Sequence, residues 1–155
     1  MTMLQTLRSH LDGQHIPYEA IHHRREYTAQ ETAADTHTPG GSFAKTVIIS
    51  VDQSFGVFVL PAVRQVDLNK VARGLGAAQV RLATEQEIAG LCPECEVGAM
   101  PPFGQFFKLP TYVSHHLAQD RMITFNAGTH EEAFRMLYRD YAVAVQPTVM
   151  DFTVD

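Results

Sequence analysis

The sequence has few cysteines and no long apolar run, and both absences exclude whole classes of protein. Cys92 and Cys95 are the only two cysteines in 155 residues, which argues against the disulfide framework of small secreted domains. Apolar stretches such as Gly56–Pro61 are far too short to span a bilayer. The segment Met1–Arg8 lacks the basic start and apolar centre of a signal peptide. We therefore expect a cytoplasmic protein with no membrane association.

Basic residues are also scarce, which limits the nucleic acids that the protein can hold. The chain has 12 Lys and Arg residues against 17 Asp and Glu residues, a formal net charge of −5. A protein that grips a long duplex through its phosphates normally carries an excess of Lys and Arg. The one dense basic cluster is His22–Arg25. We expect no DNA partner, and we expect any contact with another nucleic acid to be small and local.

Apart from these absences, the composition is that of a globular protein. Hydrophobic residues make up 45% of the chain and charged residues 19%, with no repeat, linker or low-complexity run. A length of 155 residues suits one domain with a full core, so we expect residues 1–155 to form a single domain.

Hydrophobic periodicity and capping signals predict about seven short strands and four or five helices. Helices are expected at Met3–Leu11, from a cap at Thr28 to about Asp35, from Asp67 to Gly76, from Thr84 to about Gly90, and at Glu131–Tyr141. Strands are expected at Pro17–His22, Phe43–Val51, Gly56–Ala62, Gln79–Leu82, Gln105–Lys108, Thr111–Val113 and Arg121–Asn126. This mixture predicts a single α/β (α+β) domain on a mixed, curved sheet.

The stretch Gly98–Gly104, Gly-Ala-Met-Pro-Pro-Phe-Gly, is the most distinctive in the chain. Glycine at both ends permits backbone angles that other residues avoid, and two consecutive prolines stiffen the path between them. The stretch is therefore predicted to be a rigid loop with Phe103 as an aromatic tip, a common place for a binding site. A purely structural turn is the alternative.

Lys45 is the most informative single residue. Side chains alternate along a strand, so Lys45 is expected to share the more apolar face with Val47 and Ile49. Burial there would disfavour its charge. An active-site cation facing a pocket is one interpretation, and a lysine that extends its ammonium group to solvent at the end of the strand is the other.

Two further clusters suggest chemistry less strongly. In Asn126–His130, main-chain amides between a strand and a helix would suit an anion or a carbonyl oxygen, and His130 would position substrate or move a proton. The alternative, favoured from sequence alone, is that Thr129 caps the following helix and His130 lies in its first turn. Cys92 and Cys95 invite a zinc site with His115 and His116, but a second pair of ligands is absent, so two ordinary thiols are the better interpretation. No nucleophile elbow or phosphate-cradling loop is present.

From about Thr28 to Phe134 the chain resembles the YbaK/prolyl-tRNA-synthetase-associated domain family, as a free-standing member. The resemblance rests on the order and spacing of several short pieces: Thr28–Ala33, Phe43–Val47, Val66–Leu68, Val80–Ala83, Gly98–Gly104 and Asn126–His130. It implies one α/β domain with a mixed, barrel-like sheet. One departure is Leu91–Cys95, which differs from the Thr-Gly pattern of well-studied members and places the chain in a side branch.

The resemblance also implies an activity. Characterised members hydrolyse the ester that joins a wrong amino acid to tRNA. We expect this chain to need no metal or cofactor. The resemblance assigns Lys45 to the family's essential lysine and Gly98–Pro102 to the loop that holds the acceptor-end adenosine and the ester. We expect Lys45 and Gly98 to be catalytic, with main-chain amides near Gly98 stabilising the oxyanion. Substrate contacts are expected from a larger group: Thr28, Met100, Pro101, Pro102, Phe103, Gly104, Gly128, Thr129 and His130. The expected partners are the acceptor end of a mischarged aminoacyl-tRNA, with a small amino acid and tRNA-Pro as one candidate, and an aminoacyl-tRNA synthetase. The alternatives are a non-catalytic module that binds a tRNA end, a nucleotide or a synthetase, and a metal-dependent hydrolase.

Overall fold

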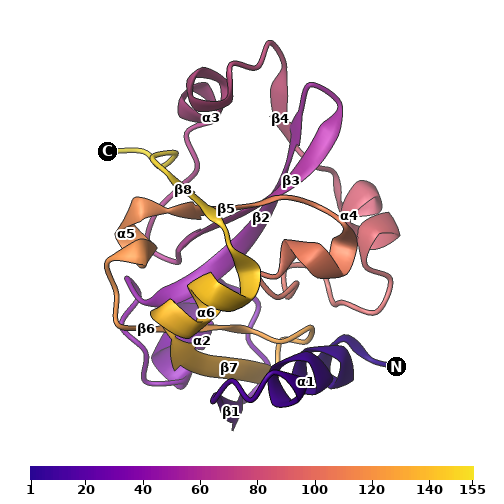
Figure 1. Ribbon diagram of the computed structural model, residues 1–155, viewed down its shortest axis with the longest axis vertical. Helices are drawn as coiled ribbons and strands as arrows, with labels where there is room; N and C mark the ends of the chain where they lie inside the picture. The colour runs from indigo at the N-terminus through magenta and orange to yellow at the C-terminus, as the bar shows by residue number, and fades with distance from the viewer.

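A mixed sheet of eight strands organises the chain (Figure 1). The computed structural model describes residues 1–155. The strand order is β1-β7-β6-β2-β3-β5-β8, and β4 pairs separately with β2. The bounds are β1 (Glu19–His22), β2 (Phe43–Val51), β3 (Ser54–Pro61), β4 (Val80–Leu82), β5 (Thr111–Ser114), β6 (Met122–Asn126), β7 (Glu132–Leu137) and β8 (Thr148–Met150). The expected mixed α/β fold is confirmed.

Short helices surround this sheet. They are α1 (Met3–Gly13), α2 (Ala29–Asp35), α3 (Leu68–Leu75), α4 (Glu85–Leu91), the 3-10 helix η1 (Gly104–Phe107), α5 (His115–Ala118) and α6 (Tyr138–Val145). The predicted starts at Thr28, Asp67 and Thr84 are confirmed, because each side chain accepts a main-chain N–H of the first helical turn. None of the helices combines the length and the apolar character that crossing a bilayer requires.

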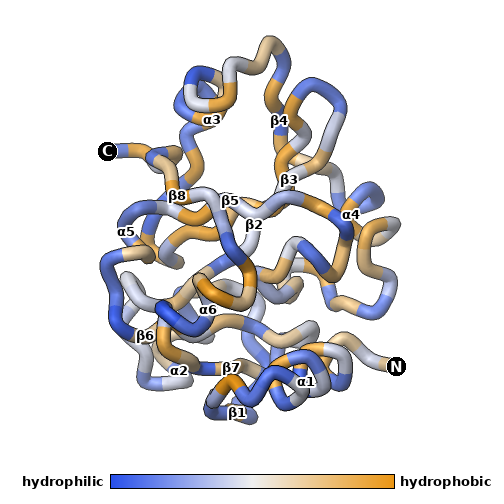
Figure 2. Tube along the Cα trace, in the orientation of Figure 1, coloured by the Kyte–Doolittle hydropathy of each residue, from blue (hydrophilic) through white to orange (hydrophobic).

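Strands β2 and β3 form the central hairpin of the sheet. Their register pairs Lys45 with Leu60 and Val51 with Ser54, so Asp52 and Gln53 alone make the turn, both with positive φ. The Asp52 carboxylate accepts the N–H groups of Ala78 and Gln79, just before β4. Figure 2 shows this turn as a hydrophilic segment above more hydrophobic strands. The turn therefore both closes the hairpin and places β4 along one end of β2.

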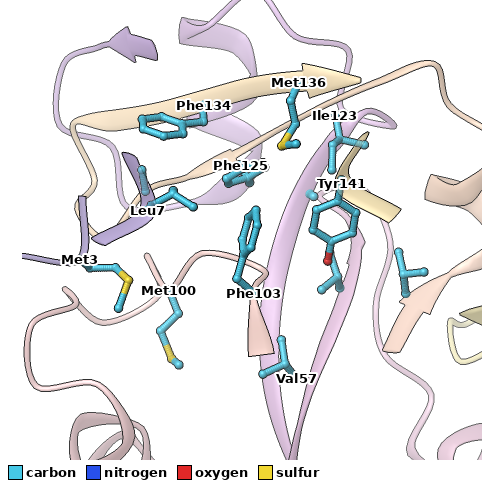
Figure 3. Packing of buried hydrophobic residues seen from close by; sticks show 14 of the residues in the cluster. Met3, Leu7, Val57, Met100, Phe103, Ile123, Phe125, Phe134, Met136 and Tyr141 are labelled. Atoms are coloured by element: carbon cyan, nitrogen blue, oxygen red, sulfur yellow. The ribbon is translucent and has the colours of Figure 1, made fainter. Parts of the chain in front are cut away.

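The main core lies on one face of the sheet and is built around aromatic rings. Phe103, Phe125 and Tyr141 are all fully buried, and Figure 3 shows their side chains converging. Phe103 makes an edge contact with Tyr141, at a ring-centroid distance of 5.5 Å. The Tyr141 hydroxyl donates to the Pro102 carbonyl at 2.6 Å. One end of the Gly98–Gly104 stretch is therefore anchored in the core.

Two of the expected elements are wrong. Glu132–Leu137 is strand β7, and the helix starts only at Tyr138. The segment contains good helix formers, but β7 pairs with both β1 and β6, and this tertiary pairing outweighs local preference. The strand expected at Gln105–Lys108 is instead η1, which ends at Lys108 in the left-handed conformation. Helix α5 and strand β8 are short elements that the sequence did not reveal.

The bond between Tyr141 and Pro102 gives a test of this anchoring. We expect Tyr141→Phe to lower the free energy of unfolding by about 1–3 kcal/mol, because the buried Pro102 carbonyl loses its donor while the ring packing is kept. Urea denaturation followed by circular dichroism measures this. Tyr138→Phe is the control, since the Tyr138 hydroxyl makes no hydrogen bond, and equal stability losses in the two variants would contradict the anchoring role.

Candidate active site

Strand β2 lacks a neighbour along the middle of one edge. On that edge β6 pairs only with Phe43 and Ala44, in parallel, and β4 pairs only with Ile49–Val51, antiparallel. On its other edge β2 pairs with β3 along nearly its whole length. The Ile48 carbonyl still accepts the Ala83 N–H just after β4, so residues 45–47 lie beside a break in the sheet between β6 and β4.

A small apolar pocket occupies this break. Its volume is about 210 Å³, and six of its eight lining residues are hydrophobic. The lining residues are Thr46, Val47, Ile48, Leu82, Ala83, Ile88, Gly98 and Met100. Four segments therefore meet at the pocket: the part of β2 that follows Lys45, the end of β4, helix α4 and the start of the Gly98–Gly104 loop. No charged side chain lines the pocket, so its polar character comes from Thr46 and from the main chain.

Gly98 lines the pocket and has a backbone conformation that suits glycine. Its φ of 82° is a conformation that side-chain-bearing residues rarely adopt, which explains the glycine. Gly98 itself is exposed, whereas the next residues, Ala99 and Met100, are buried. The Gly98 N–H makes no hydrogen bond within the protein. An N–H group that has no partner and is held by a rigid backbone is suited to bind a carbonyl oxygen that gains negative charge during ester hydrolysis.

His130 fixes the peptide that carries this N–H. Its ring lies against Gly98, and its Nε2 is 2.5 Å from the Val97 carbonyl oxygen. Because a carbonyl can only accept, Nε2 carries the proton in this contact. In a trans peptide the carbonyl and the following N–H point in opposite directions. The bond from His130 to Val97 therefore directs the Gly98 N–H away from the imidazole, and His130 acts as a positioning residue.

Glu96 joins the two loops that meet here. Its main-chain N–H donates to the Gly128 carbonyl at 2.9 Å, and its carboxylate accepts the His130 N–H at 2.6 Å. Arg25 forms an ion pair with the same carboxylate at 2.8 Å. Gly128 also donates to Ala99, at 2.9 Å. Glu96 thus holds the Gly98 loop and the Gly128–His130 loop in one arrangement.

Gly128 itself is required by close packing. Its φ is 99°, and a Cβ there would come within 2.9 Å of the Met3 side chain at the start of α1. Thr129 lies beside it, and its hydroxyl accepts the Glu131 N–H. Because β7 follows instead of a helix, both helix-based expectations for Asn126–His130 are wrong: no helix N-terminus faces an anion, and Thr129 caps no helix.

Lys45 lies on β2 directly before the residues that line the pocket. It shares its face with Val47 and Ile49, as expected, whereas Thr46 and Ile48 lie on the opposite face. The pocket is lined from both faces, by Val47 on one and by Thr46 and Ile48 on the other. The Lys45 side chain is half-buried and makes no ion pair or hydrogen bond, and burial lowers the pKa of its ammonium group. Lys45 does not line the pocket with Gly98, although its neighbours Thr46 and Val47 do. A partly desolvated cation without a partner is available to an anionic ligand at the break.

The prolines and Phe103 have a different place from the one expected. Pro101, Pro102, Phe103 and Gly104 are all buried, and Phe103 is 0% exposed. The expectation of an aromatic tip is therefore wrong, because Phe103 points into the core (Figure 3). Met100 is the residue of this group that lines the pocket. Thr28 is an exposed helix cap bonded to Glu31.

Cys92 and Cys95 form a disulfide, so the expectation of two separate thiols is wrong. Both belong to the turn that leads from α4 into Glu96, and Cys92 is buried in the main core. His115 and His116, the histidines of the zinc interpretation, lie in α5, where His115 is near Asp151. The pair closes a short loop just before the Gly98 segment.

Three residues at the site carried too weak a signal to be found in the sequence. Thr46 and Glu96 gain their meaning only from the break in the sheet and from the loop contacts. Tyr27 is 74% exposed, and its ring lies 5.6 Å from that of His130. In the sequence, only its position directly before the predicted cap at Thr28 connects Tyr27 with the site. The exposed ring adds an aromatic surface beside the Gly98 loop.

Comparisons with known proteins agree with this architecture. The aminoacyl-tRNA editing domain family matches residues 23–143, which is well over half of the chain. The chain therefore belongs to the aminoacyl-tRNA editing domain family, as its resemblance to YbaK-like domains predicted.

Individual relatives add detail. Over 105 residues the chain is 29% identical to a proline–tRNA ligase from Bacillus cytotoxicus. That match covers 68% of this chain and only 18% of the ligase, so the chain spans about a fifth of its curated relative. A solved structure described as a candidate trans-editing enzyme for prolyl tRNA synthetase superposes with a TM-score of 0.85 at 21% identity, covering 100% of this chain and 99% of the other. The hypothetical protein APE2540 gives 0.86 at 19% identity, covering 96% and 99%. These two likenesses establish the fold.

The Glu96 contacts predict a pH-dependent contribution to stability. Burial alone would raise the pKa of Glu96, but the His130 amide and the Arg25 guanidinium together hold it below its ordinary value of 4.5. A carboxyl group whose pKa is lower in the folded than in the unfolded protein stabilises the folded state at any pH above the unfolded-state pKa. This stabilisation is lost as the pH falls through the folded-state pKa. We therefore expect Glu96→Gln to reduce stability near neutral pH and to differ less from wild type below pH 4.5.

Urea denaturation across this pH range measures the difference. Glu85→Gln is the control, because the Glu85 side chain is exposed and makes no hydrogen bond or ion pair. If the difference in unfolding free energy between wild type and Glu96→Gln stays constant with pH, the proposed role of the ionised Glu96 carboxylate is contradicted.

Proposed function

We propose that this protein is a deacylase that hydrolyses the ester between a small, wrongly attached amino acid and its tRNA. The observation that carries the proposal is the unpaired N–H of Gly98, a residue that lines a small apolar pocket and whose peptide is fixed by His130. Membership of an editing-domain family supports the same reaction. The proposed substrate is the acceptor end of a mischarged tRNA.

An aminoacyl ester is already activated, so its hydrolysis needs no covalent nucleophile. Holding the ester beside a water molecule and stabilising the developing oxyanion supply much of the rate enhancement. In the proposed pose the ester carbonyl oxygen accepts the Gly98 N–H, and a ribose hydroxyl of the tRNA orients the water. No side chain in the pocket is then required to act as a general base.

Lys45 is proposed to hold the anionic part of this substrate. Its ammonium group is partly desolvated and has no partner, so a phosphate or a polarised carbonyl oxygen at the break would restore a favourable interaction. Because Lys45 leaves β2 on the face opposite to Thr46, the terminal phosphate is the better candidate. The acyl group would then occupy the pocket, and the sugar and phosphate would pass along the edge of β2.

The pocket size sets the proposed selectivity. A volume of about 210 Å³ with a mostly hydrophobic lining suits a small side chain such as that of alanine or serine. A hydrophobic pocket separates amino acids that differ by one methylene by only roughly 10–200-fold. Selection of the tRNA would then need contacts elsewhere. The net charge of −5 provides little grip on a duplex, and the match to a proline–tRNA ligase makes tRNA-Pro and a synthetase the proposed partners.

A panel of mischarged tRNAs tests the function directly. We expect wild-type protein to release alanine or serine from tRNA-Pro and to leave larger amino acids in place. We expect Lys45→Ala to lose roughly 10- to 150-fold in kcat/KM, because the charged contact to the terminal phosphate is lost. Tight binding of acylated and bare tRNA without turnover of any panel member would instead favour a non-catalytic binding module.

Gly98→Ala tests the main-chain donor. We expect a loss of roughly 100-fold in kcat, because a Cβ at a φ of 82° forces the peptide to rotate and moves the N–H away from the ester. The measurement is single-turnover deacylation, with circular dichroism to confirm the fold. Gly13→Ala is the control, since a Cβ there meets nothing within 4 Å. Full activity in Gly98→Ala would remove this N–H from the mechanism.

A further inference from the structure

The direction of the main chain along β2 identifies which polar groups face the break. In an antiparallel pair, the N–H and C=O of one residue point to the same side, and successive residues alternate. The Phe43 carbonyl accepts the Ala62 N–H on the β3 side, whereas the Ile48 carbonyl accepts the Ala83 N–H on the β4 side. Thr46 lies two residues before Ile48, so its main-chain groups point to the same side of β2 as those of Ile48. Its N–H and C=O therefore point into the break, where no strand pairs with them.

The Thr46 side chain adds a second acceptor at the same place. Thr46 lines the pocket, and its hydroxyl makes no hydrogen bond within the protein. The other lining side chains are aliphatic or, in Met100, a thioether, and Gly98 has none. The nearby carboxylates are engaged elsewhere, Glu96 by Arg25 and Glu87 by Arg81. Thr46 is therefore the one lining residue whose side chain offers an oxygen acceptor to a cationic group that enters this pocket.

We propose that Thr46, through its main-chain carbonyl and its hydroxyl, binds the α-ammonium group of the aminoacyl ester. This inference rests on the proposed deacylase function and deepens it. The pocket then has a donor, the Gly98 N–H, for the carbonyl oxygen and two acceptors on Thr46 for the adjacent ammonium group. The substrate class becomes esters with a free α-amino group, whatever small side chain they carry.

The proposal predicts different rates for three esters that share the same methyl side chain and differ only in the group on the α-carbon that would contact Thr46. An N-acetylated amino acid has lost the charge and two of the three donor hydrogens, and an α-hydroxy acid replaces the ammonium group with a neutral hydroxyl. A hydrogen bond to a charged group contributes roughly 1.5–3 kcal/mol, which corresponds to about 10- to 150-fold in kcat/KM. A pocket that reads only side-chain volume would treat alanyl and lactyl esters alike.

The experiment compares alanyl-, lactyl- and N-acetyl-alanyl-tRNA with wild type, Thr46→Val and Thr46→Ser, each rate divided by that of uncatalysed hydrolysis. We expect wild type to prefer the alanyl ester by at least roughly 10-fold over both analogues. Thr46→Val should lower kcat/KM for the alanyl ester by about 10-fold and leave the lactyl ester unchanged, and Thr46→Ser should keep the preference. Thr148→Val, on the exposed face of β8, is the control for a Thr-to-Val change.

Equal corrected rates for the three esters in wild type would overturn the proposal, as would equal losses on alanyl and lactyl esters in Thr46→Val. If wild type hydrolyses none of them, the deacylase function fails, and binding decides the inference separately. The probes are then the amide-linked 3′-alanylamino adenosine and its N-acetylated form. Tighter binding of the free amine by roughly 10-fold would support the Thr46 site, and equal affinities would overturn it.

Discussion

The interruption of strand pairing along β2 is the constraint on which the rest of the site depends. Strand β6 approaches one end of β2 in parallel and β4 approaches the other end antiparallel, so residues 45–47 have no strand beside them on this edge. Main-chain groups without partners are costly when buried, and such breaks in a sheet are closed by another segment or used for a ligand. Here Ile88 from α4 and the start of the Gly98 loop border the space without filling it.

The loop beside this break is rigid at both ends, although its first residue is exposed. At one end Glu96 and His130 fasten Val97 and Gly98 to the Gly128 loop. At the other end Phe103 is buried among aromatic rings, and Pro102 accepts a hydrogen bond from Tyr141. The polar groups that face the pocket therefore belong mainly to the backbone, so their positions depend on the fold and not on mobile side chains. Such preorganised donors and acceptors are well suited to an ester.

Much of this arrangement follows from the sequence. The strands β2 and β3, the caps at Thr28 and Thr84 and the rigid character of the Gly98 loop were predicted, because each depends on local pattern or on backbone restriction. The strand β7 was missed, since only its pairing with β1 and β6 overrides the helix-forming residues of Glu132–Leu137. Strand alternation predicted that Lys45 and Thr46 leave β2 on opposite faces. The sequence could not show what surrounds each of them, because that depends on which strands end beside them.

The most direct test of the central claim is an amide NMR measurement on the protein with a non-hydrolysable 3′-alanylamino adenosine. Titration with this ligand should shift the Gly98 N–H resonance by hydrogen bonding to the acyl carbonyl, with accompanying changes at Thr46 and Met100. The resonances of α3 and β8, which lie away from the pocket, should stay unchanged. A saturating ligand that leaves the Gly98 amide unshifted and perturbs another surface would contradict the account.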